Sequence, residues 1–184
     1  MVCILLARPD MSLAAAAVLG LQAVSNPWVP HLRPELMLRP LVEEAAERSP
    51  SIRALIDRLE ASDLIVYVRM RQFSRSDLNG RVALLSAMPA RHRYLMIELA
   101  CGRPDVVTMS TLGHELYHAV EIALEPSIVD ARGLIAYDTR AGDRTGDRQG
   151  NITFETRGAE QAGVQVRREL FTTPTPTRHT WTLK

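Results

Sequence analysis

The sequence predicts an α+β fold, in which a helical segment precedes three strands and further helices follow. The helical pattern is clear at residues 50–61, where Ile52, Leu55 and Ile56 fall on one face. Residues 64–70 then combine β-branched and aromatic side chains, which is typical of a strand. This order of elements predicts a small twisted sheet with a backing helix, and not a regular alternation of strands and helices.

Local start signals place most of the elements. Ser49 before Pro50 is a helix N-cap followed by proline at the first helical position. Pro104 and Asp105 start a longer helix in a similar way, with the acid near the positive helix end. The expected elements are helices over 40–48, 50–61, 105–124, 126–137 and 152–170, and strands over 64–70, 82–88 and 92–100.

The remaining segments read as connections. Residues 26–39 contain three prolines and predict a loop, residues 77–80 a turn, and the glycine-containing residues 141–150 a mobile loop. Asn151 is the expected N-cap of the last helix, and residues 171–184 are expected to form a disordered tail. The domain therefore spans residues 26–170, with an upper lobe over 26–125 and a lower lobe over 126–170.

The composition gives no reason to expect a nucleic-acid partner. The formal net charge is +1, and the arginines are scattered among acidic residues. Cys3 and Cys101 form no CxxC pair, so cysteine ligation of a metal is not expected.

The first 25 residues contain an apolar run over 12–24, too short for a stable membrane span. This run has the length of a secretory h-region, with Arg8 upstream and Ala23-Val24-Ser25 as a cleavage site. The expected location is therefore periplasmic or extracellular. An N-terminal helix of a cytoplasmic protein is the alternative.

The segment from His114 to His118 reads His-Glu-Leu-Tyr-His, inside the expected helix 105–124. Histidines four residues apart project from nearly the same side of a helix, so both can bind one zinc ion. Glu115 lies about 100° from His114 around the axis, where it flanks the metal without ligating it. That position suits a general base for a zinc-bound water. Without a metal, the same segment would be an ordinary surface pattern.

A zinc site needs a third protein ligand, and Glu155 is the preferred candidate. On the expected helix 152–170 it begins a stripe with the small residues Ala159 and Ala162, and a carboxylate on such a face needs a partner. Glu121 is the alternative ligand. Because it shares one helix with both histidines, it is better placed as a supporting acceptor.

The motif followed by Glu155-x-x-x-Ala159 resembles the gluzincin clan of zinc metallopeptidases, over about residues 111–162. The resemblance implies a zincin-like fold, in which a sheet, a backing helix and an active-site helix form one lobe and a helix of the other brings the glutamate. Many clan members have an aspartate where this chain has Ala159. In the clan, that aspartate supports a histidine of the motif. Asp130 and Asp138 are candidates for the same role here, although plain surface charge is the simpler interpretation of both.

The resemblance also implies that an edge strand binds the substrate peptide as an added strand. Residues 82–88 or 92–100 are the candidates for that edge. Tyr137 and His92 are candidate donors to the oxyanion of the transition state, whereas Tyr117 is expected to serve packing.

The expected function is a zinc-dependent metallopeptidase that acts on a peptide or protein substrate, with Glu115 and Tyr137 as catalytic residues. The zinc ligands would be His114, His118 and Glu155. A non-catalytic, zinc-stabilised binding module, an inactive relic of such an enzyme, is the alternative. The sequence leaves the substrate, the cleavage preference and the oligomeric state open.

Overall fold

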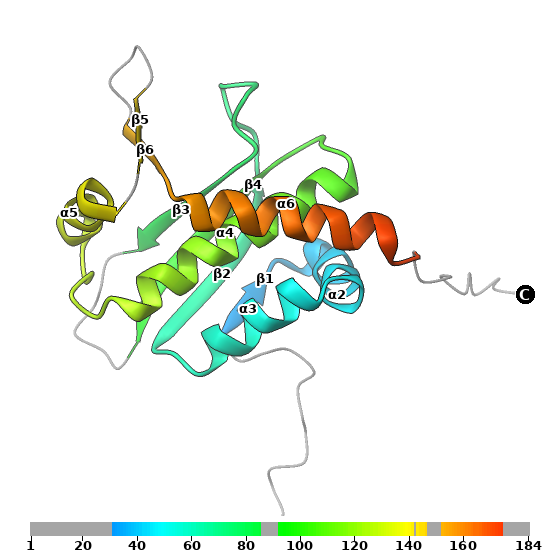
Figure 1. The fold of residues 1–184 in the computed structure, drawn as a ribbon, viewed down its shortest axis with the longest axis horizontal. Helices are drawn as coiled ribbons and strands as arrows, with labels where there is room; N and C mark the ends of the chain where they lie inside the picture. Colours follow the sequence, from blue (N-terminus) through cyan, green and yellow to red (C-terminus); the bar gives the residue numbers. More distant parts are fainter. Residues whose placement is uncertain (1–30, 86–91, 142, 147–151, 175–184) are drawn as a thin grey trace, which may run out of the picture.

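The computed structural model describes residues 31–85, 92–141, 143–146 and 152–174. Within these ranges the fold is α+β, with a mixed four-stranded sheet, a two-stranded hairpin and several helices (Figure 1). The elements in chain order are β1 (Leu32–Pro34), η2 (Leu36–Leu38), α2 (Arg39–Arg48), α3 (Pro50–Glu60), β2 (Leu64–Arg71), β3 (Gly80–Leu85), β4 (Arg93–Ala100), α4 (Asp105–Leu124), α5 (Ala131–Ala141), β5 (Asp143–Gly146), β6 (Ile152–Glu155) and α6 (Arg157–Thr172).

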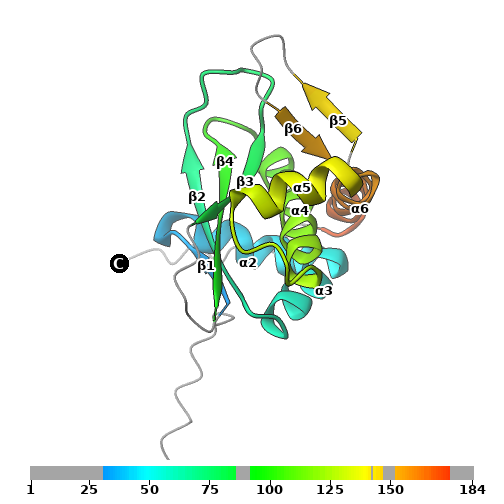
Figure 2. The ribbon, with the colours of Figure 1, turned by 90° about the vertical axis from the view of Figure 1, so that its left-hand side faces the viewer.

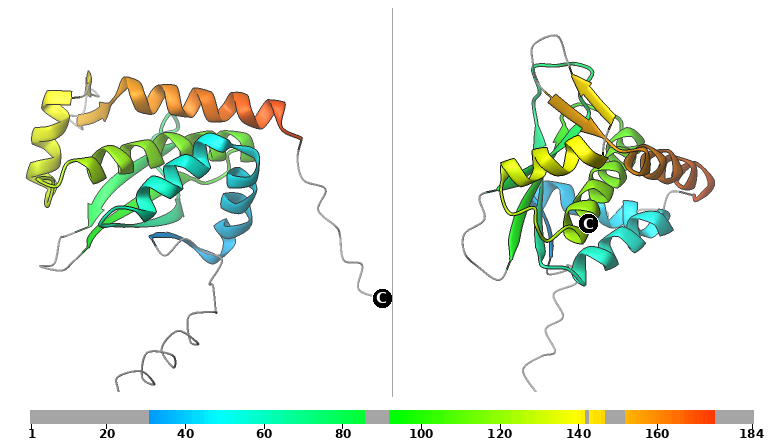
Figure 3. Two further views of the ribbon diagram at one scale, coloured as in Figure 1. Left: turned by 60° about the horizontal axis from the view of Figure 1, so that its bottom comes forward. Right: turned by 60° about the vertical axis from the view of Figure 1, so that its left-hand side comes forward.

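The main sheet has the strand order β1-β2-β4-β3, so β1 and β3 form its two edges. β1 pairs with β2, and β2 with β4, in parallel, whereas β3 runs antiparallel to β4. Helices α3 and α4 cover one face of this sheet, and α6 lies over α4 on the side away from the strands (Figures 2 and 3). The result is a layered structure in which α4 is enclosed between the sheet and α6.

A single hydrophobic cluster joins these layers. Strand side chains alternate between faces, and those that point toward the helices form its centre. The largest fully buried apolar side chains are Ile52, Leu59, Leu64, Leu95, Ile97, Leu99, Met109, Leu112, Leu116, Ile128 and Leu170. Because Leu170 and Val166 of α6 belong to this cluster, the C-terminal helix is part of the same core as the sheet.

Helices α2, α3 and α4 follow the sequence prediction closely. Ser49 caps α3, since its hydroxyl accepts a hydrogen bond from the amide of Ile52 at 3.1 Å. The long helix α4 has the predicted bounds. Gly102, with a φ of 74°, makes the left-handed reversal between β4 and α4, a conformation that glycine adopts without strain.

The prediction of a loop over residues 26–39 is wrong for its described part. Residues 32–34 form β1, which pairs with residues 66–68 of β2, and a short 3-10 helix follows. Pro34 is compatible with β1 because this strand lies at the sheet edge.

The predicted helix over 126–137 begins five residues late. Arg93 explains the delay, because its guanidinium donates to the carbonyls of Ile122, Glu125 and Ile128 and holds the chain after α4 in a turn. The helix starts only after Asp130, whose carboxylate accepts a hydrogen bond from the amide of Gly133 at 2.7 Å.

Two further predictions between residues 141 and 170 are wrong. Residues 143–146, expected in a loop, form β5, which pairs with β6 in an antiparallel hairpin. Residues 152–155, expected at the start of the last helix, form β6, and α6 begins after Thr156. The missed signal is the run Ile-Thr-Phe-Glu-Thr, which is rich in β-branched and aromatic residues.

Some predictions fall outside the described residues. They are the export segment over residues 1–25, the N-cap at Asn151 and most of the expected tail. Two residues assigned to that tail, Phe171 and Thr172, are the last residues of α6. None of the helices in the described ranges has the length and apolar character that crossing a membrane requires.

Candidate metal centre

The two motif histidines lie near the middle of α4, on the side that faces α6. His114 and His118 are one turn apart, and their ring centroids are separated by 4.9 Å. Their side chains are 20% and 16% exposed, so both rings are largely sheltered and still reachable. The helical spacing therefore brings the imidazoles together as the sequence predicts.

Glu155, the last residue of β6, joins these histidines from another part of the chain. Its Oε2 atom lies 3.0 Å from Nε2 of His114 and 3.9 Å from Nε2 of His118. One ligand atom from each of the three residues lies within 4.8 Å of the other two. Such a spacing is compatible with three ligands around one ion at about 2 Å each.

The environment of Glu155 Oε2 fits a metal ligand. This oxygen is buried and lies at ion-pair distance, 3.0 Å, from Nε2 of His114. A cation at the point where the three atoms converge would be bound by the carboxylate together with both imidazoles. Burial favours a higher pKa for Glu155, but the adjacent His114 and His118 lower it to about 2.

Glu121 supports His118 and is not among the three converging residues. Its Oε2 lies 3.0 Å from Nδ1 of His118 and accepts a hydrogen bond from the hydroxyl of Thr156 at 3.1 Å. With a proton on Nδ1, His118 donates a hydrogen bond to Glu121. Its Nε2 atom, which is nearer Glu155, then has a lone pair that can bind a metal ion. Burial favours a lower pKa for His118, but Glu121 and Glu155 raise it to about 10 in the metal-free protein.

Thr156 connects this network to the start of α6. Its hydroxyl caps the helix by accepting a hydrogen bond from the amide of Ala159 at 3.2 Å, and it also donates to Glu121. Thr156 therefore fixes both the start of α6 and the Glu121 carboxylate. Because it directly follows Glu155, it also holds the candidate ligand in place. The sequence prediction missed Thr156 because it placed the N-cap at Asn151.

Glu115 lies on the sheet side of α4, next to the first residue of β3. The residue is only 5% exposed, and burial raises its pKa to about 7, against the opposing effect of the two histidines. A Cβ atom on Gly80 would come within 2.7 Å of Glu115 Oε1 and 2.6 Å of the Thr111 methyl group. Gly80 therefore leaves the space that the Glu115 carboxylate occupies, a role that a lone glycine in the sequence did not signal.

Glycines also permit the close packing of α6 on α4. A Cβ on Gly163 would lie 3.3 Å from Cβ of His114, and one on Gly158 would lie 2.5 Å from the Tyr117 ring. Glycine lowers the intrinsic stability of a helix, and the structure explains these two by the short distance between α6 and α4. Tyr117 packs against the core, in agreement with its predicted role.

The other candidate residues lie as follows. Tyr137 is on α5, half-buried and packed against the core, and its role as an oxyanion donor stays a prediction. Asp130 caps α5, whereas the side chain of Asp138 is outside the described part of the structure.

His92 directly precedes β4 and lies near the C-terminal end of α4. Its Nδ1 lies 3.2 Å from the Asp63 carbonyl, and the neighbouring Arg93 binds carbonyls at the C-terminal end of α4. Eight residues, or roughly 12 Å of helix, separate His114 from Ile122 at that end. His92 therefore lies away from the candidate metal centre.

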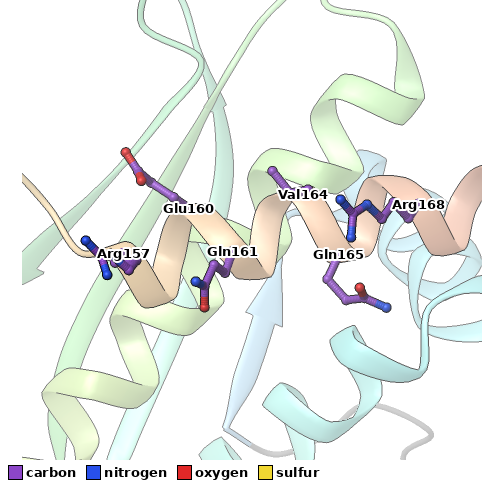
Figure 4. A pocket seen from close by; sticks show the side chains of 6 residues that line it. All are labelled: Arg157, Glu160, Gln161, Val164, Gln165 and Arg168. Atoms are coloured by element: carbon purple, nitrogen blue, oxygen red, sulfur yellow. The ribbon is translucent and has the colours of Figure 1, made fainter.

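A shallow hollow runs along the outer side of α6 (Figure 4). Its lining is mostly polar and charged, with Arg157, Glu160, Gln161, Val164, Gln165 and Arg168. Glu160 is exposed there. None of these six residues belongs to the candidate metal centre.

Comparisons with known proteins leave the site to be interpreted from its own geometry. No family, no curated protein and no solved structure matches the chain.

Proposed function

We propose that the protein is a zinc-dependent metallopeptidase with a zincin-like arrangement of sheet, active-site helix and ligand-bearing C-terminal segment. The observation that carries the proposal is the convergence of Glu155 with the two motif histidines, in which one ligand atom of each residue lies within 4.8 Å of the other two. A cation is the partner that satisfies all three groups together.

The ligand types favour zinc. Two imidazoles and one carboxylate are a ligand set of catalytic zinc sites, which keep a further coordination position for water or substrate. Glu121 adds the carboxylate that commonly orients a zinc-bound histidine, and this contact is 3.0 Å long. Zinc held by these residues would supply a Lewis acid that lowers the pKa of water toward neutrality.

Glu115 is the residue that we propose as general base and acid. It is adjacent in sequence to a ligand, it is buried, and burial raises its pKa in the metal-free protein, which favours a carboxylate that can accept a proton. In the proposed mechanism its carboxylate takes a proton from the attacking water and returns it to the amine leaving group. Gly80 keeps the carboxylate in its position against β3.

The edge strand β3 is the proposed site for the peptide main chain. It begins at Gly80, which lies against Glu115, and the described strands leave its outer edge unpaired. An extended peptide can add to such an edge by main-chain hydrogen bonds. Of the two candidate edges from the sequence, we favour residues 82–88, of which 82–85 are described and belong to the edge strand β3, because β4 is an inner strand.

The test combines metal analysis with hydrolysis of a fluorescein-labelled protein substrate such as casein. We expect one zinc per chain in the purified protein, loss of zinc in Glu155→Ala, and retained zinc without hydrolysis in Glu115→Gln. Glu160→Gln, which removes an exposed acid of α6, is the matched control and should keep both properties. Full hydrolysis by Glu115→Gln would exclude the proposed mechanism.

The same experiment separates the enzyme from the alternative binding module. A wild-type protein that holds stoichiometric zinc through Glu155 and cleaves no peptide bond would support the module. A wild-type protein that binds no zinc would exclude both.

A further inference from the structure

A cluster of three arginines around one glutamate lies on the face of the sheet that the helices leave uncovered. Leu95, Ile97 and Leu99 of β4 point into the core, so Glu98 between them points to the other face. Its side chain is only 1% exposed, because three arginines from neighbouring strands cover it. These donors are Arg69 and Arg71 of β2 and Arg81 of β3.

This cluster is positively charged on its outer surface. Three guanidinium groups share one carboxylate, which leaves two positive charges in excess. The arginine side chains remain 42–45% exposed, so each presents part of its guanidinium to solvent. The near-neutral net charge of the whole chain therefore conceals a locally basic surface.

Arg81 is the member of this cluster at the sheet edge. Its Nε donates to Glu98 Oε2 at 2.5 Å, and its guanidinium carbon lies 5.8 Å from the centre of the Phe73 ring. The carboxylate and the aromatic ring hold the charged group in one place. A partner therefore meets an already positioned guanidinium, which reduces the entropic cost of binding it.

The register of β3 fixes how a peptide would meet Arg81. The amide of Ala100 donates to the carbonyl of Asn79, so residues 79, 81, 83 and 85 direct their main-chain groups toward β4. Gly80, Val82 and Leu84 consequently direct theirs toward the free edge. A strand added antiparallel there would form non-hydrogen-bonded pairs at Arg81, where Cα atoms approach to about 4.5 Å and side chains are closest.

We infer that the peptide bound along β3 carries an aspartate or glutamate opposite Arg81. The inference rests on the proposed peptidase function, and it adds the substrate class, namely extended acidic peptides. Side chains of the added strand alternate between the two sheet faces. The residue opposite Arg81 thus points to the arginine cluster, while its neighbour opposite Gly80 points to the side of Glu115 and the metal ligands.

The test begins with the cleavage of a random peptide library by the zinc-loaded protein, read by mass spectrometry. We expect Asp and Glu to be enriched at one fixed position relative to the cleaved bond. A peptide pair with Glu or Gln at that position then gives kcat/KM for the wild type, Arg81→Gln and Arg33→Gln. Arg33 lies on β1, at the opposite edge of the same sheet, and its loss changes the net charge equally.

In the wild type and in Arg33→Gln, kcat/KM should be roughly fivefold higher for the Glu peptide than for the Gln peptide, as expected from the energy of a partly exposed charge pair. Arg81→Gln should lose this preference. A library without acidic enrichment, or a preference that survives in Arg81→Gln, would overturn the inference.

A binding assay separates this inference from the proposed function. Fluorescence anisotropy compares labelled peptides of alternating Thr and Glu with peptides of alternating Thr and Gln, using the metal-free protein and the same variants. Tighter binding of the Glu peptide that depends on Arg81, without any hydrolysis by the zinc-loaded protein, would support the acidic subsite and contradict the peptidase. If neither hydrolysis nor such Arg81-dependent binding is found, the acidic subsite is wrong as well.

Discussion

Glu98 and Glu115 are both buried glutamates next to the edge strand β3, but their surroundings have opposite effects. Three arginines lower the pKa of Glu98 to about 2, against the effect of burial. Burial raises the pKa of Glu115 to about 7, and only two imidazoles oppose it. Burial alone therefore does not set the pKa of a carboxylate. Glu98 is ionised at neutral pH because its counter-charges lie within the fold, whereas Glu115 titrates near neutral pH in the metal-free protein.

The largest expected difference concerns folding stability. Glu98→Gln leaves three arginines around an uncharged amide, and we expect it to lower the free energy of unfolding by roughly 3 kcal/mol at pH 7. Glu115→Gln removes a carboxylate whose ionisation is disfavoured by burial, so the stability of the metal-free protein should change by less than about 0.5 kcal/mol or increase. Urea unfolding measures both, and equal losses would contradict this contrast.

The pH dependence of stability should have opposite signs for the two residues in the metal-free protein. The folded pKa of Glu98 is below its ordinary value of 4.5, so its contribution is present above about pH 4.5 and is lost as the pH falls toward 2. The folded pKa of Glu115 is above 4.5, so its ionisation destabilises the fold as the pH rises from 4.5 to about 7. Urea unfolding at several pH values between 2 and 7 measures both. As the pH rises, the wild type should gain stability relative to Glu98→Gln and lose stability relative to Glu115→Gln.

A substitution at Gly80 should affect Glu115 without changing the metal ligands. In Gly80→Ala, the new methyl group would lie within 2.7 Å of the Glu115 carboxylate and must displace it. We expect kcat/KM to fall roughly a hundredfold, the cost of about 1 Å of misplacement, while zinc content stays at one per chain. Ala83→Gly, on the same strand but away from Glu115, is the control. Loss of zinc together with activity would show that Gly80 acts on the fold and not on the base.

The smallest expected effect concerns Thr156. Thr156→Ala removes the hydroxyl that caps α6 and donates to Glu121, so zinc affinity should fall roughly tenfold and stability by about 1 kcal/mol. Thr172→Ala, at the other end of the same helix, should leave zinc affinity unchanged. Zinc titration with a competing chelator measures the affinity, and an unaffected Thr156→Ala would remove Thr156 from the proposed network.

Local sequence signals were sufficient for the motif helix. The caps of α3 and the bounds of α4 depend on neighbouring residues, and the spacing of His114 and His118 fixes their common side. Glu155 was predicted as the third ligand from a helical stripe that does not exist at that residue, because Glu155 ends β6. The structure brings Glu155 to the histidines through the β5–β6 hairpin and the Thr156 cap.

The features that sequence reasoning missed depend on contacts between distant segments. Arg93 delays α5 through carbonyls at the end of α4, and Gly80 matters only because α4 packs against β3. The arginines around Glu98 come from two strands, β2 and β3, and Glu98 itself from β4 between them, so their proximity follows from strand order and register. Such pairings have no short-range signal in a single sequence.

The position of Glu155 has a consequence for the order in which the site is assembled. The two histidines belong to one helix and can face the same point as soon as α4 forms. Glu155 lies 31 residues beyond the end of α4 at Leu124, at the end of the hairpin that follows α5, so it is synthesised well after the two histidines. For the proposed zinc site, a chain synthesised only as far as α4 would offer an incomplete pair of imidazoles, and tight binding of an ion would require the C-terminal segment. Zinc binding would then also fasten α6 to the rest of the domain.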